Sequence, residues 1–160
     1  MQERSRRRIC AVAICAACVA VSAAVADGRQ IAGEHVVLPA ATSEWRDGPP
    51  GMPPGGKFAV ISGNPREPGR FTMRVELPAG YVLAPYRVAS DESMVVLAGS
   101  LQLGSGTMFD PSTLQTLDTG AFVTLRANRT HFVSTKQGAV VQICGNGPFA
   151  IEYVAPGSEH

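Results

Sequence analysis

From residue 57 onward, the chain consists of short apolar or alternating segments separated by Gly, Pro, Asn and Asp. Apolar residues at a period of two are typical of strands with one buried face, and the residues between them are typical of turns. This spacing predicts an all-β sandwich or barrel. Only residues 110–117 suit a helical turn, because Asp110 can cap it and Pro111 suits its first position. The expected strands are residues 58–62, 71–77, 81–87, 93–103, 122–125, 131–134, 139–143 and 149–153.

The segment before residue 57 has a different composition. Residues 27–56 contain five prolines and several glycines, which prevent a regular helix and remove backbone donors from any central strand. We therefore expect an extended lead-in, with an edge strand at 35–38. A chain of 160 residues is about one domain, so we expect a single barrel over residues 57–155 and a short tail at 156–160.

Residues 1–26 have the pattern of a targeting segment. Four arginines precede an apolar run at 9–21, and Ala-Val-Ala at 24–26 suits a cleavage site. The run is shorter than the roughly 20 residues of a spanning helix, which favours a cleaved signal peptide over an anchor. We expect export to the periplasm or the medium. The arginines partly resemble a twin-arginine signal, so the Sec and twin-arginine routes both stay open.

Cleavage after residue 26 would change the charge and the thiol content. It would leave ten of 14 basic residues and twelve of 13 acidic ones, a net charge of −2 without any basic cluster. Such a surface argues against nucleic acid as a partner. Three of the four cysteines lie in the removed segment, so Cys144 would have no intramolecular disulfide partner.

Two segments carry a resemblance to a known family. Residues 80–99, GYVLAPYRVASDESMVVLAG, have the spacing of the first cupin motif: Gly, five residues, His-x-His, three residues, Glu, six residues, Gly. Residues 120–135, GAFVTLRANRTHFVST, are similar to the second motif: Gly, five residues, Pro-x-Gly, two residues, His, three residues, Asn. The resemblance covers about residues 51–156. It implies a jelly-roll β-barrel of two antiparallel sheets with a ligand site inside the open end.

The same resemblance implies where a divalent metal would be held. In cupins, two His and a Glu of the first motif and a His of the second bind the ion. Here Tyr86 and Val88 replace the first two, whereas Glu92 and His131 match. Val88 has no donor atom, and a Tyr phenol is a poor ligand at neutral pH. We therefore expect no tightly held cofactor, with weak divalent-metal binding by Glu92 and His131 as the alternative.

The second motif departs from the pattern at two turn positions. Asn128 stands where Gly is expected, and because Asn tolerates the left-handed backbone, it should preserve the turn. Arg126 stands where Pro is expected. It could pair with a carboxylate ligand at the mouth of the barrel or be a solvated surface residue.

Five polar residues are candidates for the lining of the pocket. Tyr86, Glu92 and His131 follow from the motif positions, and Tyr86 and Glu92 share the parity of one strand face. Gln142 and Cys144 share a face of their own strand, and small cupins often carry His where Cys144 stands. Cys144 is therefore a candidate replacement ligand or reactive thiol, or a small buried apolar residue.

These observations support three hypotheses for the function. The first is an exported cupin-like module that binds a small molecule in a metal-free barrel. The second is an enzyme: a metal-dependent oxygenase or isomerase using Glu92, His131 and a ligand such as Cys144, or a metal-free catalyst with His131 as base. The third is a structural barrel without a ligand. A homodimer is compatible with each of them.

Overall fold

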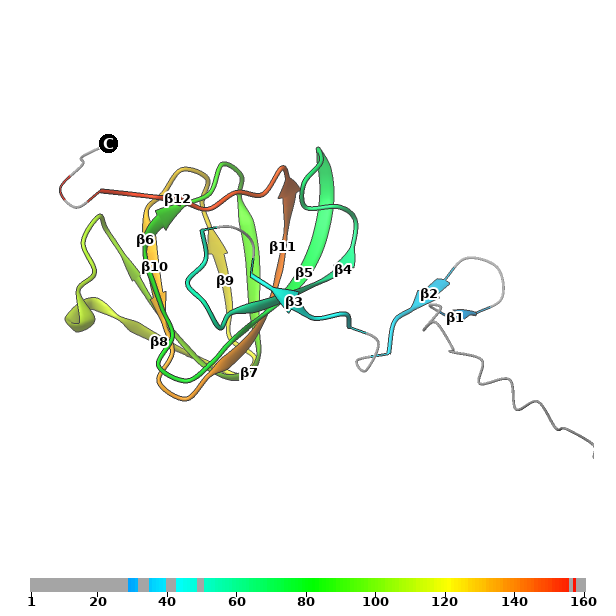
Figure 1. Ribbon diagram of the computed structural model, residues 1–160, viewed down its shortest axis with the longest axis horizontal. Coiled ribbons are helices and arrows are strands. Elements are labelled where there is room, and N and C mark those ends of the chain that lie inside the picture. Colours follow the sequence, from blue (N-terminus) through cyan, green and yellow to red (C-terminus); the bar gives the residue numbers. More distant parts are fainter. Residues whose placement is uncertain (1–28, 32–34, 40–42, 49–50, 156, 158–160) are drawn as a thin grey trace, which may run out of the picture.

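The computed structural model describes residues 29–31, 35–39, 43–48, 51–155 and 157 (Figure 1). The expected signal peptide at 1–26 lies outside the described residues, as do parts of the lead-in and most of the tail at 156–160. In the described ranges, no helix is long and apolar enough to span a membrane.

The described chain is an all-β, jelly-roll barrel of antiparallel strands, as the sequence predicts. One sheet has the strand order β9-β7-β11-β5-β4-β3, and the other has the order β8-β7-β10-β6-β12. The long strand β7 belongs to both. The strands are β3 (Arg46–Asp47), β4 (Lys57–Ser62), β5 (Gly69–Leu77), β6 (Val82–Arg87), β7 (Glu92–Ser105), β8 (Gln115–Asp118), β9 (Phe122–Leu125), β10 (His131–Ser134), β11 (Ala139–Gly147) and β12 (Glu152–Tyr153).

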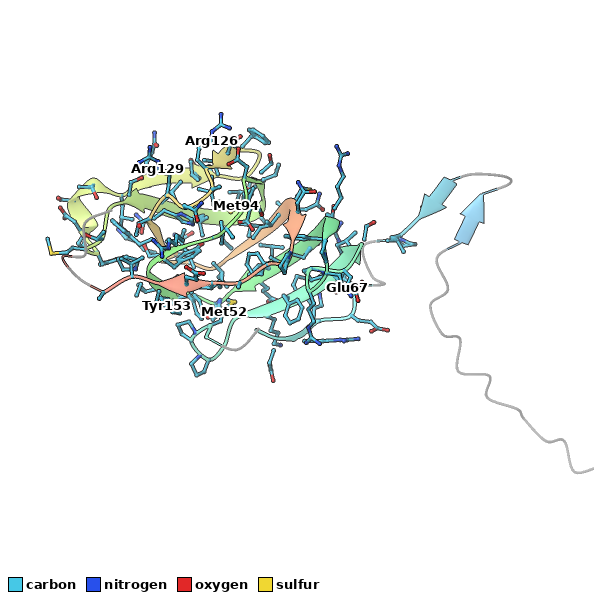
Figure 2. All side chains as sticks on the ribbon, turned by 90° about the horizontal axis from the view of Figure 1, so that it is seen from above. Met52, Glu67, Met94, Arg126, Arg129 and Tyr153 are labelled. Atoms are coloured by element: carbon cyan, nitrogen blue, oxygen red, sulfur yellow. The ribbon has the colours of Figure 1, made fainter. Side chains whose placement is uncertain are left out.

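Alternation along the strands places the core between the two sheets. On β5, Phe71, Met73, Val75 and Leu77 are buried, whereas the residues between them are more exposed. Burying an apolar side chain of this size contributes roughly 1.5–3 kcal/mol relative to leaving it exposed, so this face holds β5 against the facing sheet. Figure 2 shows side chains of the strands lying between the sheets.

Strand β7 changes sheets at Gly99. Its first half pairs with β9 and β11, and its second half pairs with β8 and β10. Gly99 has φ +71°, and a Cβ there would overlap the carbonyl oxygen of Gly138, which lies just before β11. Glycine is required at this position for two reasons: its backbone has a positive φ, and the Gly138 carbonyl group next to β11 leaves no room for a Cβ atom.

Several expected elements differ from those in the structure. The helical turn is confirmed, but it is shortened to η2 (Pro111–Thr113), where the Asp110 side chain accepts a hydrogen bond from the Ser112 backbone N–H. The rest of that segment forms β8, which the sequence did not predict. The strand expected at 139–143 is longer in the structure, because residues 145–147 continue β11 and pair with 69–71 of β5. In the lead-in, β2 (His35–Val37) pairs with β1 (Arg29–Ile31) rather than with the barrel.

Replacing Gly99 with alanine should destabilise the barrel more than the same change at Gly80. Both residues have positive φ, which costs alanine about 1 kcal/mol, but a Cβ at Gly80 meets nothing within 4 Å. We expect Gly80→Ala to lose about 1 kcal/mol of unfolding free energy and Gly99→Ala at least about twice that. Urea denaturation measures both values. Equal losses would show that β7 and β11 can separate at this contact without cost.

Candidate functional site

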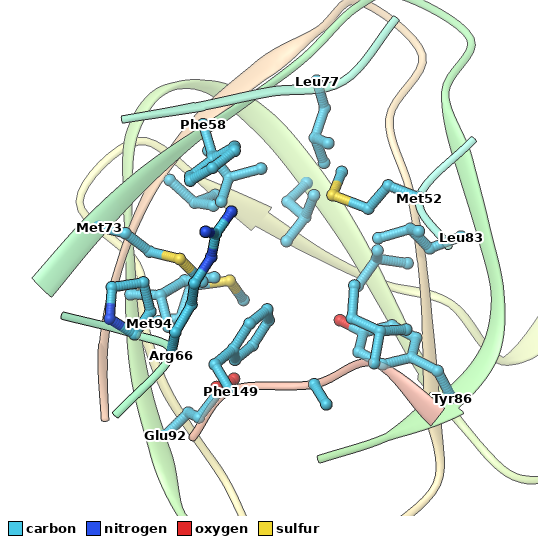
Figure 3. A pocket seen from close by; sticks show the side chains of 18 residues that line it. Met52, Phe58, Arg66, Met73, Leu77, Leu83, Tyr86, Glu92, Met94 and Phe149 are labelled. Carbon is cyan, nitrogen blue, oxygen red and sulfur yellow. The ribbon is translucent and has the colours of Figure 1, made fainter. Parts of the chain in front are cut away.

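The barrel encloses a cavity of about 270 Å³ between its two sheets (Figure 3). Its wall is mostly apolar, and the only polar side chains among its described lining residues are Arg66, Tyr86 and Glu92. The apolar lining residues are Met52, Phe58, Pro65, Met73, Val75, Leu77, Leu83, Met94, Leu101, Val133, Val141, Ile143, Phe149, Ala150 and Ile151. A concave apolar site with a few polar groups is the usual form of a small-molecule site.

Glu92 is the buried carboxyl group of this cavity. It is the first residue of β7, and its side chain lies inward because it shares the parity of the core residues Met94 and Val96. The residue is only 3% exposed, and its Oε1 atom has no hydrogen-bond partner. Burial disfavours the carboxylate and raises the pKa of Glu92 to about 7. At and below neutral pH, much of this side chain is therefore a neutral acid that can both donate and accept a hydrogen bond.

His131 begins β10 and is 4% exposed. Its Nδ1 lies 3.1 Å from the carbonyl oxygen of Arg129, and a neutral ring that donates this hydrogen bond has a free lone pair on Nε2. Nε2 is buried and has no hydrogen-bond partner. Burial lowers the pKa of His131, which favours the neutral ring.

Tyr86 lies between the cavity and His131. The two residues face each other across β6 and β10, and their ring centroids are 4.3 Å apart at an interplanar angle of 62°. Burial, and then the nearby Glu92 charge, raise the pKa of Tyr86 strongly, so its hydroxyl stays protonated. Figure 3 shows the Tyr86 side chain at the cavity wall, and His131 is not among the described lining residues. His131 therefore contacts the ring that lines the cavity rather than the cavity itself.

The second-motif turn has the geometry that the sequence predicts at Asn128. This residue has φ +60°, and its backbone N–H donates a 2.8 Å hydrogen bond to the carbonyl oxygen of Val88. Of its two expected roles, Arg126 takes that of an exposed surface residue. Its Nη1 pairs with Oδ2 of Asp91 at 2.8 Å, with both side chains more than half exposed, so it pairs with a surface carboxylate and not with Glu92.

Gln142 and Cys144 lie on the face of β11 opposite to the cavity, which corrects their expected placement. They share a face, as their parity predicts, but the cavity face of β11 carries Val141 and Ile143. Gln142 Oε1 accepts a hydrogen bond from Arg74, and the exposed Cys144 Sγ lies 3.5 Å from the Thr72 hydroxyl. Parity shows which residues share a face, but not which face is inside. Cys144 therefore cannot replace a missing ligand in the barrel.

Two segments outside the motifs complete the cavity wall. Pro65 and Arg66 come from the loop between β4 and β5, and 149–151 come from the segment before β12. The backbone N–H of Phe149 donates a 2.7 Å hydrogen bond to the Pro65 carbonyl oxygen, which joins these segments. The sequence carried no signal for this role, because a loop's position over a barrel depends on tertiary contacts.

Comparison with known proteins identifies the family. Residues 22–152 match the model of a family described as "Domain of unknown function (DUF4437)". The chain belongs to the DUF4437 family. No curated protein matches this DUF4437 sequence.

Solved structures show that this DUF4437 chain has a cupin fold. The polyketide cyclase RemF from Streptomyces resistomycificus is similar with a TM-score of 0.60 and 13% identity, over 76% of this chain and 86% of RemF. An RmlC-like cupin from Shewanella frigidimarina NCIMB 400 gives a TM-score of 0.54 and 13% identity, over 71% and 91% of the two chains. The DMSP lyase DddQ from Ruegeria pomeroyi DSS-3 gives 0.57 and 18%, over 74% and 64%. At these identities, the likeness shows the fold alone.

The donor atoms of this DUF4437 barrel do not fit a resident divalent metal. A catalytic metal site normally takes about three protein ligands. Glu92 and His131 could offer two, but Val88 has no donor atom and the Tyr86 phenol stays protonated. No cluster of three His, Cys, Asp or Glu residues that could hold an ion occurs in the part of the chain that the structure describes.

Replacing Glu92 with glutamine should stabilise this DUF4437 protein at alkaline pH and leave its stability nearly unchanged at pH 4. The folded-state pKa of about 7 exceeds the ordinary value of 4.5, so wild-type stability is lost as pH rises from about 4.5 through 7. A shift of this size corresponds to roughly 3 kcal/mol. Urea denaturation of both proteins at pH 4 and pH 8 isolates this contribution, because the opposing titration of His131 is common to both. A constant difference between the proteins would contradict the raised pKa.

Proposed function

We propose that this protein is an exported cupin-fold module that binds a small, largely apolar molecule inside its barrel, with Tyr86 and Glu92 as hydrogen-bonding partners. The support for export is the arginine-rich start and apolar run of residues 1–26. The observation that carries the binding proposal is that Glu92 lines an apolar cavity while its buried Oε1 atom has no hydrogen-bond partner in the protein.

The physical reason to expect a bound molecule is the free-energy cost of leaving the buried Glu92 oxygen without a hydrogen bond. A buried polar atom without a partner destabilises the folded protein by about 1–3 kcal/mol. A bound molecule that offers a hydroxyl or carbonyl group to Glu92 removes this cost, and its apolar part replaces water against residues such as Met73 and Met94. A polar group at one point and an apolar body elsewhere therefore describe the ligand that the cavity favours.

The binding proposal predicts that a bulky residue at position 150 will block an apolar probe. Ala150 lines the cavity but is exposed, so tryptophan should enter the cavity mouth without disturbing the core. We expect Ala150→Trp to weaken binding of the neutral fluorophore N-phenyl-1-naphthylamine by about tenfold or more, a change of about 1.4 kcal/mol.

The matched control is Ala84→Trp, which adds the same ring at an exposed position of β6 that does not line the cavity. Fluorescence titration of wild type and both variants gives the three affinities. Equal weakening by the two variants, or no saturable binding to the wild type, would reject the proposal.

A second candidate function is metal-free proton transfer by Glu92. The same unpaired carboxyl in an apolar wall favours it, because desolvation makes a carboxylate a stronger base than it is in water. The cupin fold does not choose between binding and catalysis.

This candidate predicts base-catalysed ring opening of 5-nitrobenzisoxazole. The Glu92 carboxylate would take the proton on C3, the C–H electrons would form the nitrile, and the N–O bond would break to give the phenolate. We expect Glu92→Gln to lower the rate about 100-fold, in line with the loss of a general base. The control Glu76→Gln removes an exposed carboxylate on β5. The absorbance of the phenolate product measures the rate. Equal rates for the wild type and Glu92→Gln would reject catalysis by Glu92.

A further inference from the structure

Arg66 is the only basic residue among the described residues that line the cavity. It lies in the loop between β4 and β5, at the mouth, and its side chain is exposed. Figure 3 shows its guanidinium group extending over the cavity, which Phe58 and Met73 also line. No ion pair in the described part of the chain involves Arg66, although Glu67 is its neighbour in sequence.

The loop that carries Arg66 is held in place by backbone contacts. The Arg66 N–H donates a 3.0 Å hydrogen bond to the Asn64 side-chain oxygen, and the Glu67 N–H donates one of 3.2 Å to the Asn64 carbonyl oxygen. The Phe149 N–H bonds to the Pro65 carbonyl oxygen, and Gly147 packs so closely that a Cβ there would overlap the Glu67 carbonyl oxygen. The base of the Arg66 side chain is therefore fixed relative to the cavity, which lowers the entropy lost when it binds a ligand.

The charges around the cavity favour an anion. Among the described residues that line the cavity, Glu92 is the only acidic one, and its burial disfavours the carboxylate. The mouth therefore presents a guanidinium group that forms no ion pair within the described part of the chain. A guanidinium binds a carboxylate through two parallel N–H···O bonds, which gives geometric specificity as well as attraction.

We infer that the ligand is an amphipathic monocarboxylic acid. Its carboxylate binds Arg66 at the mouth, its apolar body lies among Phe58, Met73 and Met94, and a hydroxyl or carbonyl group on that body pairs with Glu92. This inference rests on the proposed binding function and names its ligand class. The cavity wall excludes water from the apolar body, and the exposed guanidinium lets the carboxylate stay partly hydrated. An alcohol of the same chain length would gain the apolar contacts alone.

The test compares octanoate with 1-octanol as competitors of N-phenyl-1-naphthylamine on the full chain. For the wild type, we expect octanoate to displace the fluorophore at a concentration at least about tenfold lower than octanol does, with a preference that shrinks as salt rises. Arg66→Gln should remove the preference and leave the octanol affinity unchanged. Arg66→Lys, which keeps the charge but loses the two-bond geometry, should retain part of it.

The matched control is Arg70→Gln, which removes an exposed arginine at the start of β5 that does not line the cavity. It should leave both affinities unchanged. Equal affinities of octanoate and octanol in the wild type, or equal losses of both in Arg66→Gln, would overturn the assignment of an acid while the cavity still binds apolar molecules. Failure of both competitors, together with no saturable fluorophore binding to the wild type, would reject the proposed binding function itself.

Discussion

Strand β7 (Glu92–Ser105) is the element on which the barrel and its cavity both depend. It pairs with four other strands, two in each sheet, and its bend at Gly99 lets one continuous strand close both layers. The same strand begins with Glu92, whose inward direction follows from the register that the pairing imposes. A one-residue shift in the register of β7 would turn Glu92 outward and Ser93 inward. The register that forms the barrel therefore also fixes the inward position of the carboxyl group.

The interior retains polar atoms that the surrounding protein does not satisfy. Glu92 Oε1 and His131 Nε2 are both buried without partners, whereas the other buried polar residues, Ser134 and Thr135, are hydrogen-bonded. A fold under selection for stability alone would gain by replacing such groups with apolar ones. Glu92 lines the apolar cavity, so its unpaired oxygen is the physical argument for a bound molecule, whereas His131 lies behind Tyr86 and does not line the cavity.

The polar groups of the cavity lie in two separate regions. Arg66 lies at its mouth on a loop tied to the segment at 149–151, whereas Tyr86 and Glu92 lie on its wall from β6 and β7. The Arg66 guanidinium is always charged, whereas burial favours the neutral form of Glu92. The mouth and the wall should therefore attract different parts of one molecule. This chain thus combines a cupin fold with a set of polar side chains that differs from a divalent-metal site in its chemistry.

The sequence by itself determined the all-β class, most of the strands and the turn at Asn128, because alternation, turn residues and glycine spacing are local properties. Motif spacing and parity were enough to indicate Tyr86 and Glu92 as pocket residues, and both are buried and line the cavity. Only the tertiary structure decided that Gln142 and Cys144 lie outside, since parity does not say which face of β11 is covered by the other sheet. The structure also decided that His131 lies behind Tyr86 and that Arg66 reaches the mouth. Both depend on contacts between segments far apart in the chain, which no local pattern records.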